Sequence, residues 1–128
     1  MKTDSGPLFA RVNTTVKEFI GDPRLSIKLG FAIPMKLKTG LNLPDADENE
    51  SLAVVEDEIR ETVARNASGI HVLTLTNAVM KEFIFYIEPG ADIAAMHKLL
   101  MNNVKSHEVQ CMAVRDPGWE TYLEFSPN

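Results

Sequence analysis

Cysteine is nearly absent from this sequence, and long apolar runs are absent altogether. The single cysteine, Cys111, has no second thiol in the chain with which to form a disulfide, so the composition does not call for an oxidising compartment. No stretch approaches the ~18 apolar residues that a membrane-spanning helix needs. The start of the chain also has no apolar run of the length found in secretory signal peptides. We therefore expect a cytoplasmic protein with no membrane partner.

Basic residues are also few. The chain has 13 Lys and Arg against 18 Asp and Glu, which gives a formal net charge of -5. Nucleic-acid binding depends on a basic face that displaces counterions from phosphates, so this balance argues against a nucleic-acid partner. What is present is ordinary, because 45% of the 128 residues are hydrophobic and 24% are charged. Length and composition together predict a single domain over residues 1–128.

Alternating apolar residues predict two strands in the first third of the chain. A short alternation covers residues 8–13, and a longer one runs through residues 25–33, where every odd position is apolar. The longer strand ends at Pro34, which cannot donate a hydrogen bond to a sheet. Residues 21–23 read Gly-Asp-Pro and predict a turn between the two strands. Residues 36–50 predict an exposed loop.

Apolar residues at three- and four-residue steps predict two helices farther along the chain. The first follows a run of acids, which the positive end of a helix dipole favours, and Gly69 is expected to end it. Its apolar stripe consists of Leu52, Val55, Ile59, Val63 and Ala67. Asp92 is expected to cap the second helix through its carboxylate. The stripe of this second helix consists of Ile93, Met96, Leu100 and Val104.

Two runs rich in β-branched and aromatic residues, 70–76 and 80–87, predict a hairpin. In the second of these strands, Phe83, Phe85 and Ile87 fall on alternate positions. We expect these three side chains to face the core.

The remaining segment completes an α+β order. A last strand is expected at residues 108–114, followed by a short helix with Asp116 as cap and Pro117 as its first residue. The full order is β-β-α-β-β-α-β-α. It predicts a ferredoxin-like (βαββαβ) antiparallel sheet with two helices on one face, plus an extra N-terminal strand and a short C-terminal helix. In that fold the strand at residues 25–33 is central, so the N-terminal strand must pair with a sheet edge unless the strand order differs.

No group of residues predicts catalysis, a cofactor or a metal site. The segment 45–56 has acids at several positions of a calcium-binding loop, but Glu50 stands where that loop requires Gly. An acidic segment before a helix is already explained by the helix dipole. The three histidines have no spacing that brings two imidazoles to one metal, and Cys111 lies four residues after His107 across a loop. We expect no catalytic, cofactor-binding or metal-binding residues.

Aromatic residues gather near the C-terminus, where Trp119, Tyr122 and Phe125 lie close together. In a helix, Trp119, Tyr122 and Leu123 share one face. One interpretation is a structural lid, capped by Asp116 and packed over an open end of the sheet. The other is an anchor for a partner protein, because Trp and Tyr dominate interface hot spots. The sequence leaves both interpretations open.

The same segment also resembles the closing motif of a known bacterial family. Three stretches carry the resemblance: Asp116-Pro117-Gly118-Trp119 with Tyr122, Phe125 and Pro127; Glu82-Phe83-Ile84-Phe85-Tyr86 after Thr74 and Thr76; and Leu52 with Glu56-Asp57. Taken in order, they are similar to domain-of-unknown-function family 695 over about residues 8–127. The family supplies no catalytic residues to carry over. The resemblance implies that such a domain is often joined to one resembling the regulator of ribonuclease E activity B, a ferredoxin-like inhibitor that works by binding an enzyme.

We therefore expect a non-catalytic protein-interaction or regulatory module whose partner is another protein. The alternative is a small-ligand-binding protein, or an enzyme with an unrecognised site on the open face of the sheet. A pocket lined by His71, Tyr86 or Cys111 favours this alternative, whereas a flat exposed apolar patch favours the interaction module. The sequence leaves the oligomeric state open.

Overall fold

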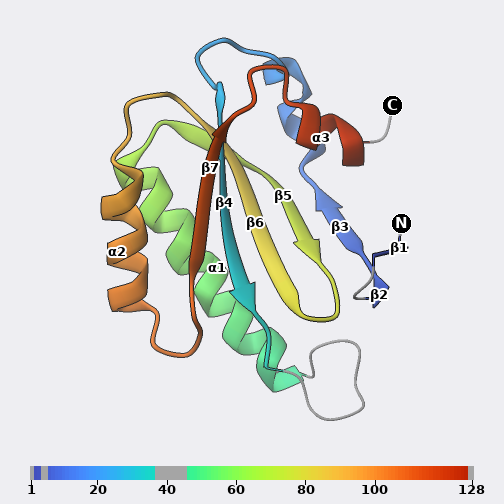
Figure 1. Ribbon diagram of the computed structural model, residues 1–128, viewed down its shortest axis with the longest axis vertical. Coiled ribbons are helices and arrows are strands. Elements are labelled where there is room, and N and C mark those ends of the chain that lie inside the picture. The colour runs from blue at the N-terminus through green and yellow to red at the C-terminus, as the bar shows by residue number, and fades with distance from the viewer. Residues whose placement is uncertain (1, 4–5, 37–45, 127–128) are drawn as a thin grey trace.

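One antiparallel sheet of five strands organises the protein, and a computed structural model describes residues 2–3, 6–36 and 46–126 (Figure 1). The strands of this sheet are β3 (Phe9–Val12), β4 (Ile27–Pro34), β5 (Gly69–Thr76), β6 (Met80–Ile87) and β7 (Gln110–Arg115). Their spatial order is β3-β5-β6-β4-β7. The helices are α1 (Ala46–Asn66), α2 (Ile93–Asn103), α3 (Glu120–Phe125) and a 3-10 helix, η1 (Thr14–Phe19). Two short N-terminal strands, β1 (Lys2–Thr3) and β2 (Gly6–Pro7), pair with each other.

The N-terminal strand β3 lies at an edge of the sheet, where it pairs with β5 and not with β4. The requirement for an edge position is therefore confirmed. The segment between β3 and β4 includes the predicted turn, where Gly21 has a φ of 76°. Before this turn it forms the 3-10 helix η1, which the sequence did not predict. Asn13 caps η1, since its side chain accepts a hydrogen bond from the backbone N–H of Thr15 at 3.1 Å.

The central strand β4 pairs with β6 on one side and β7 on the other. Leu29, Phe31 and Ile33 are fully buried on one face, as their alternation predicts. Leu25 does not continue this pattern, because β4 begins at Ile27 and Leu25 packs in a separate core on the opposite side of the sheet.

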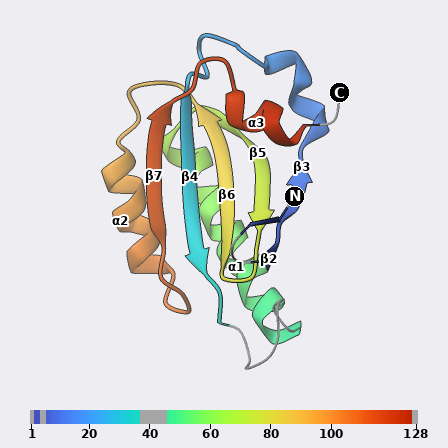
Figure 2. The same cartoon turned by 45° about the vertical axis from the view of Figure 1, so that its right-hand side comes forward.

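Both long helices pack in one core on the same face of the sheet; α1 runs behind the strands and α2 lies beside β7 in Figures 1 and 2. The predicted stripes of both helices and the three apolar residues predicted for β6 meet in this first core. Its fully or nearly fully buried members include Leu52, Val55, Ile59 and Val63 of α1, Met96 and Leu100 of α2, and Phe83, Phe85 and Ile87 of β6. Asp92 caps α2 as expected, accepting a hydrogen bond from the N–H of Ala95 at 3.0 Å. No helix in the described part of the chain is long and apolar enough to span a membrane.

The two ends of α1 differ from the prediction. The helix begins at Ala46, so residues 46–50 of the predicted loop are helical, while residues 37–45 lie outside the described residues. Gly69 does not end α1, which stops at Asn66; it is the first residue of β5. A Cβ atom at Gly69 would lie 2.5 Å from the carbonyl oxygen of Tyr86 on β6. Glycine is therefore required here by the close approach of two strands.

A second, smaller core lies on the other face of the sheet. Figure 2 shows α3 in front of one end of the strands, while α1 lies behind them. The second core includes Val72, Leu73, Ile84, Tyr86, Trp119 and Tyr122. Within the described residues, the sheet is thus covered along one face by two helices and only at one end of the other face, by α3 and η1.

Truncating Ile59 tests the packing of α1 against the first core. Its side chain is fully buried, so Ile59→Ala should lower the free energy of unfolding by about 2–5 kcal/mol, because it leaves a cavity. Val54 on the same helix is 67% exposed, so Val54→Ala is the matched control and should change stability by less than about 0.5 kcal/mol. Denaturant unfolding measures both values. Equal losses in the two variants would contradict the assignment of the buried stripe.

Candidate functional site

The carboxylate of Asp116 organises the turn between β7 and α3. It accepts hydrogen bonds from the N–H groups of Glu120 and Thr121, at 2.9 and 3.2 Å, and from the hydroxyl of Tyr86 at 2.6 Å. The Asp116 carboxylate therefore caps the N–H groups of α3 as predicted, although the residue at the N-cap position is Trp119. Pro117 is not the first helical residue, however, because Trp119 has a φ of 56° and α3 begins only at Glu120. This left-handed residue interrupts the helical path that the prediction assumed.

These contacts hold Asp116 and Tyr86 in opposite protonation states. Burial alone would raise the pKa of Asp116, but the hydrogen bonds from Tyr86 and from two backbone N–H groups outweigh it and lower the pKa. Burial raises the pKa of Tyr86, and its hydrogen bond to Asp116 raises it further. The carboxylate is thus an ionised acceptor, and the phenol is a protonated donor.

The C-terminal aromatic residues are packed inside the protein. The indole of Trp119 stacks on the ring of Tyr86 at 4.4 Å and donates a hydrogen bond to the carbonyl of Leu25 at 2.9 Å. The hydroxyl of Tyr122 donates to the carbonyl of Asn13 at 2.7 Å. Phe125 is half-buried and packs against the same core. These are the contacts of a lid.

Leu123 does not share the buried face that the spacing predicts. It is 50% exposed, whereas Trp119 and Tyr122 are fully buried. The prediction was wrong because Trp119 precedes the helix in a left-handed conformation. Its side chain therefore does not lie on the helix face of Leu123, although the Leu123 N–H still donates to the Trp119 carbonyl at 2.9 Å.

A groove lined by His71 lies between α1 and the β3–β5 end of the sheet. It has a volume of about 510 Å³ and shares Asn13, Arg60 and His71 with a neighbouring groove of about 330 Å³. In the smaller groove, Arg11 Nη2 lies 2.6 Å from Glu56 Oε2 and 3.0 Å from Thr74 Oγ1.

The histidine in this groove is already engaged as well. His71 Nε2 lies 3.0 Å from the carbonyl oxygen of Leu73, and the imidazole stacks on Phe85 with ring centroids 4.7 Å apart. Burial lowers the pKa of His71, which favours the neutral imidazole. The polar groups around the groove are therefore largely bonded to one another.

Cys111 and His107 do not form a nucleophilic pair. His107 is buried and its Nε2 lies 2.8 Å from Glu48 Oε2 at the start of α1. Cys111 is half-buried on β7, and burial raises the pKa of its thiol to about 11. A thiol with so high a pKa is protonated near neutral pH and is a poor nucleophile. Cys111 does line a groove of about 500 Å³ between α2 and β7.

The described residues contain no group of three His, Cys, Asp or Glu side chains that could hold a metal ion. Of the acidic segment that resembles a calcium-binding loop, Asp45 lies outside the described residues. Asp47 and Asn49 lie in the first turns of α1. A helical backbone cannot wrap their side chains around one ion as a calcium loop does.

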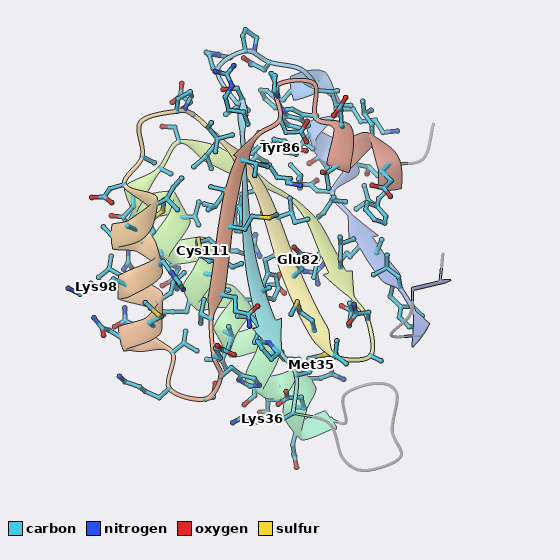
Figure 3. The ribbon with its side chains drawn as sticks, in the orientation of Figure 1. Met35, Lys36, Glu82, Tyr86, Lys98 and Cys111 are labelled. Carbon is cyan, nitrogen blue, oxygen red and sulfur yellow. The ribbon has the colours of Figure 1, made fainter. Side chains whose placement is uncertain are left out.

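The part of the second sheet face that α3 leaves uncovered centres on Gly30 of β4. Because paired residues share a face, Gly30 lies between Ile84 on β6 and Met112 on β7. A Cβ atom built on Gly30 would lie 3.7 Å from Glu82 Oε2 and 3.8 Å from Met112 Cε. The Glu82 carboxylate and the Met112 methyl group therefore lie over a glycine that leaves room for them. Figure 3 shows Glu82 in the middle of the sheet, beyond the end that α3 covers.

Glu82 is a half-buried carboxyl group without a direct partner among the described residues. None of them lies within hydrogen-bond or ion-pair distance of it. Burial raises its pKa, and the positive charge of Lys28 offsets this only in part. Lys28 itself donates a hydrogen bond to Thr121 Oγ1 at 2.9 Å. Folding thus removes water from the Glu82 carboxyl group on the uncovered face without placing a positive charge in contact with it.

Apolar side chains extend this face toward β7. Met112 is 41% exposed and Val114 is 44% exposed. We call the surface of Lys28, Gly30, Glu82, Met112 and Val114 the open face. Sequence reasoning missed Glu82, although its position is readable: it alternates with Phe83 and Phe85, and so lies on the face opposite the first core.

The comparisons with known proteins identify the family. The family described as "Family of unknown function (DUF695)" matches residues 1–126. The chain belongs to this family. No curated protein and no solved structure matches the DUF695 chain described here.

Removing the Trp119 indole tests the lid. Because the indole is fully buried and stacked, Trp119→Ala should lower the free energy of unfolding by about 3–5 kcal/mol. Trp119 is the only tryptophan, so the folded protein should show blue-shifted emission that acrylamide quenches poorly. A red-shifted, readily quenched emission in the folded protein would contradict a lid and favour an anchor.

Asp116→Asn should reveal the ionised carboxylate through pH. Folding lowers the pKa of Asp116 below its ordinary value of 3.8. Its contribution to stability is therefore complete above that pH and is lost as the pH falls through the folded-state pKa. At pH 7 the variant should be less stable than the wild type by about 2 kcal/mol, and the difference should shrink below pH 4. Urea unfolding across this pH range measures it, and a constant difference would exclude this role.

Proposed function

We propose that this DUF695 chain is a non-catalytic protein-interaction module that binds a partner protein through the open face. The observation that carries the proposal is Glu82, a desolvated carboxyl group without a direct partner among the described residues, with Met112 beside it. A charged group that is half-buried without neutralisation is costly to the protein alone. The same group becomes favourable when a partner supplies the missing cation.

The chemistry of the open face defines the partner. A Lys or Arg side chain would neutralise Glu82, and the apolar atoms around that cation would cover Met112 and Val114. Exposed apolar residues grouped around one polar group are typical of interaction surfaces. We therefore propose a protein partner that presents a basic residue among apolar ones.

Nucleic acid is a poorer match to the same surface. Single-stranded RNA binding to a sheet relies on exposed aromatic rings that stack with bases. On the face that carries Glu82, the aromatic residue of β6 is Tyr86, which is fully buried. A carboxylate at the centre of the face would also repel phosphates.

The alternative function is binding of a small polar ligand in the groove lined by His71. Its size, about 510 Å³, and the presence of His71 favour this alternative. However, a ligand that binds His71 Nε2 in this groove would have to displace its existing contact with the carbonyl oxygen of Leu73. A partner could bind the Glu82 carboxyl group of the open face without breaking an existing bond, so we favour the open face as the binding site.

We also propose a fold type and a cellular location for this protein. We propose a ferredoxin-like arrangement with an added edge strand, supported by the order β7-β4-β6-β5 and by antiparallel pairing throughout. We also propose a cytoplasmic location, supported by the single cysteine, since cytosolic thiols stay reduced.

Reversing the charge of Glu82 tests the interaction. In affinity capture from a lysate, partner proteins held by the wild type should fall by about tenfold or more with Glu82→Lys, because two cations would then meet at the centre of the interface. Asp57→Lys is the matched control, since Asp57 is exposed on α1 and lines the groove that contains His71. Thermal unfolding should show that both variants fold. Unchanged capture with Glu82→Lys would refute the proposal, and loss with Asp57→Lys alone would favour the groove.

A further inference from the structure

Among the residues that the structure describes, strand β7 is a free edge of the sheet, paired with β4 on one side only. Five of its six residues are exposed, and its register with β4 runs without a bulge from Gln110 to Arg115. Proteins usually protect such an edge with Lys, Pro or a bulge. The residues from Gln110 to Val114 include no Lys and no Pro, so β7 is open to pairing with another strand.

We propose that two copies of this chain pair through β7. The two strands would run antiparallel about a twofold axis, joining the two five-stranded sheets into one continuous sheet. This inference goes beyond the proposed function, because it uses the backbone edge of β7 and does not involve Glu82.

The charges around β7 fit a second copy in this orientation. Glu108 lies just before the strand and Arg115 is its last residue, and both are exposed. Antiparallel pairing brings the Arg115 end of one copy beside the Glu108 end of the other, twice by symmetry, whereas parallel pairing would bring like charges together. The residues between these ends carry no charge, so no like charges meet along the strand itself. Salt screens the rest of the net charge of -5 on each copy at distances beyond about 10 Å.

Side chains on both sides of β7 would gain cover from such pairing. Met112 and Val114 project on the open face, and Cys111 and Ala113 project toward α2 (Figure 3 labels Cys111). On the α2 side, β7 borders a groove of about 500 Å³ near Met101 and another of about 270 Å³. A paired strand would lie against both grooves and bury apolar surface on both faces.

The other edge of the sheet is a weaker candidate. Strand β3 has four residues, and it carries Arg11, whose guanidinium pairs with Glu56. A short edge strand with an inserted charge is one of the ordinary protections against pairing. The β7 edge is longer and has no comparable charge before its last residue.

Charge exchange at the two ends of β7 provides the decisive test. In sedimentation equilibrium of the full chain, the wild type should dimerise with a Kd below about 200 µM. Glu108→Arg and Arg115→Glu should each raise the dimer Kd by about tenfold or more, because each brings like charges together twice. An equimolar mixture of the two variants should recover wild-type affinity, since each then supplies the charge that the other needs. A monomeric wild type, or a mixture no tighter than the separate variants, would overturn the proposal.

Two further measurements identify the surface. Cys111 is the only thiol and is a poor nucleophile, whereas its neighbour Gln110 is exposed on β7. In a chain that carries both Cys111→Ala and Gln110→Cys, a short bismaleimide should therefore link two copies. A monofunctional maleimide should confirm that the thiol reacts. A dimer whose reactive thiols do not cross-link would place the contact elsewhere and refute pairing through β7. Glu82→Lys should dimerise like the wild type, which separates a failure of this proposal from a failure of the proposed function.

Discussion

The five-stranded sheet has two faces with apolar residues, and its two long helices cover only one of them. This constraint determines the rest of the structure. The first core takes the stripes of α1 and α2, and the chain must close the other face with what remains. It does so with η1 and with the turn and short helix after β7. A six-residue helix is too short to be stable by itself, so α3 depends on the Asp116 carboxylate and on the stacked rings of Trp119 and Tyr86.

Because that second cover is small, it reaches only one end of the sheet. At the covered end, Asp116 is satisfied by three donors and its pKa is lowered. Beyond it, Glu82 has no such donors among the described residues, and burial raises its pKa. The two carboxyl groups are on the same side of the sheet and differ mainly in what covers them. The contrast explains why the first is structural and why we assign the second to binding.

The same incomplete cover links the two proposals. A sheet face with exposed apolar residues and a free edge at β7 offers two separate means of association, one through side chains and one through backbone groups. Pairing through β7 would place two open faces side by side in one continuous sheet. A partner with two binding sites could then contact Glu82 in both copies. The second contact would form within the same complex, so the overall affinity would exceed that of either contact alone.

The sequence by itself determined the strands of the large sheet and its two long helices, although it missed η1 and the first turn of α1. Local alternation and helical spacing depend on neighbouring residues, so the buried faces of β4, β6, α1 and α2 were predictable. The family followed from motifs such as Asp116 to Trp119. Tertiary structure alone decided three things: the position of β3 beside β5, the left-handed turn at Trp119 that frees Leu123 from the core, and the isolation of Glu82. Each of these features depends on which distant segments pack next to a residue. The periodicity of apolar residues within one segment cannot predict such contacts.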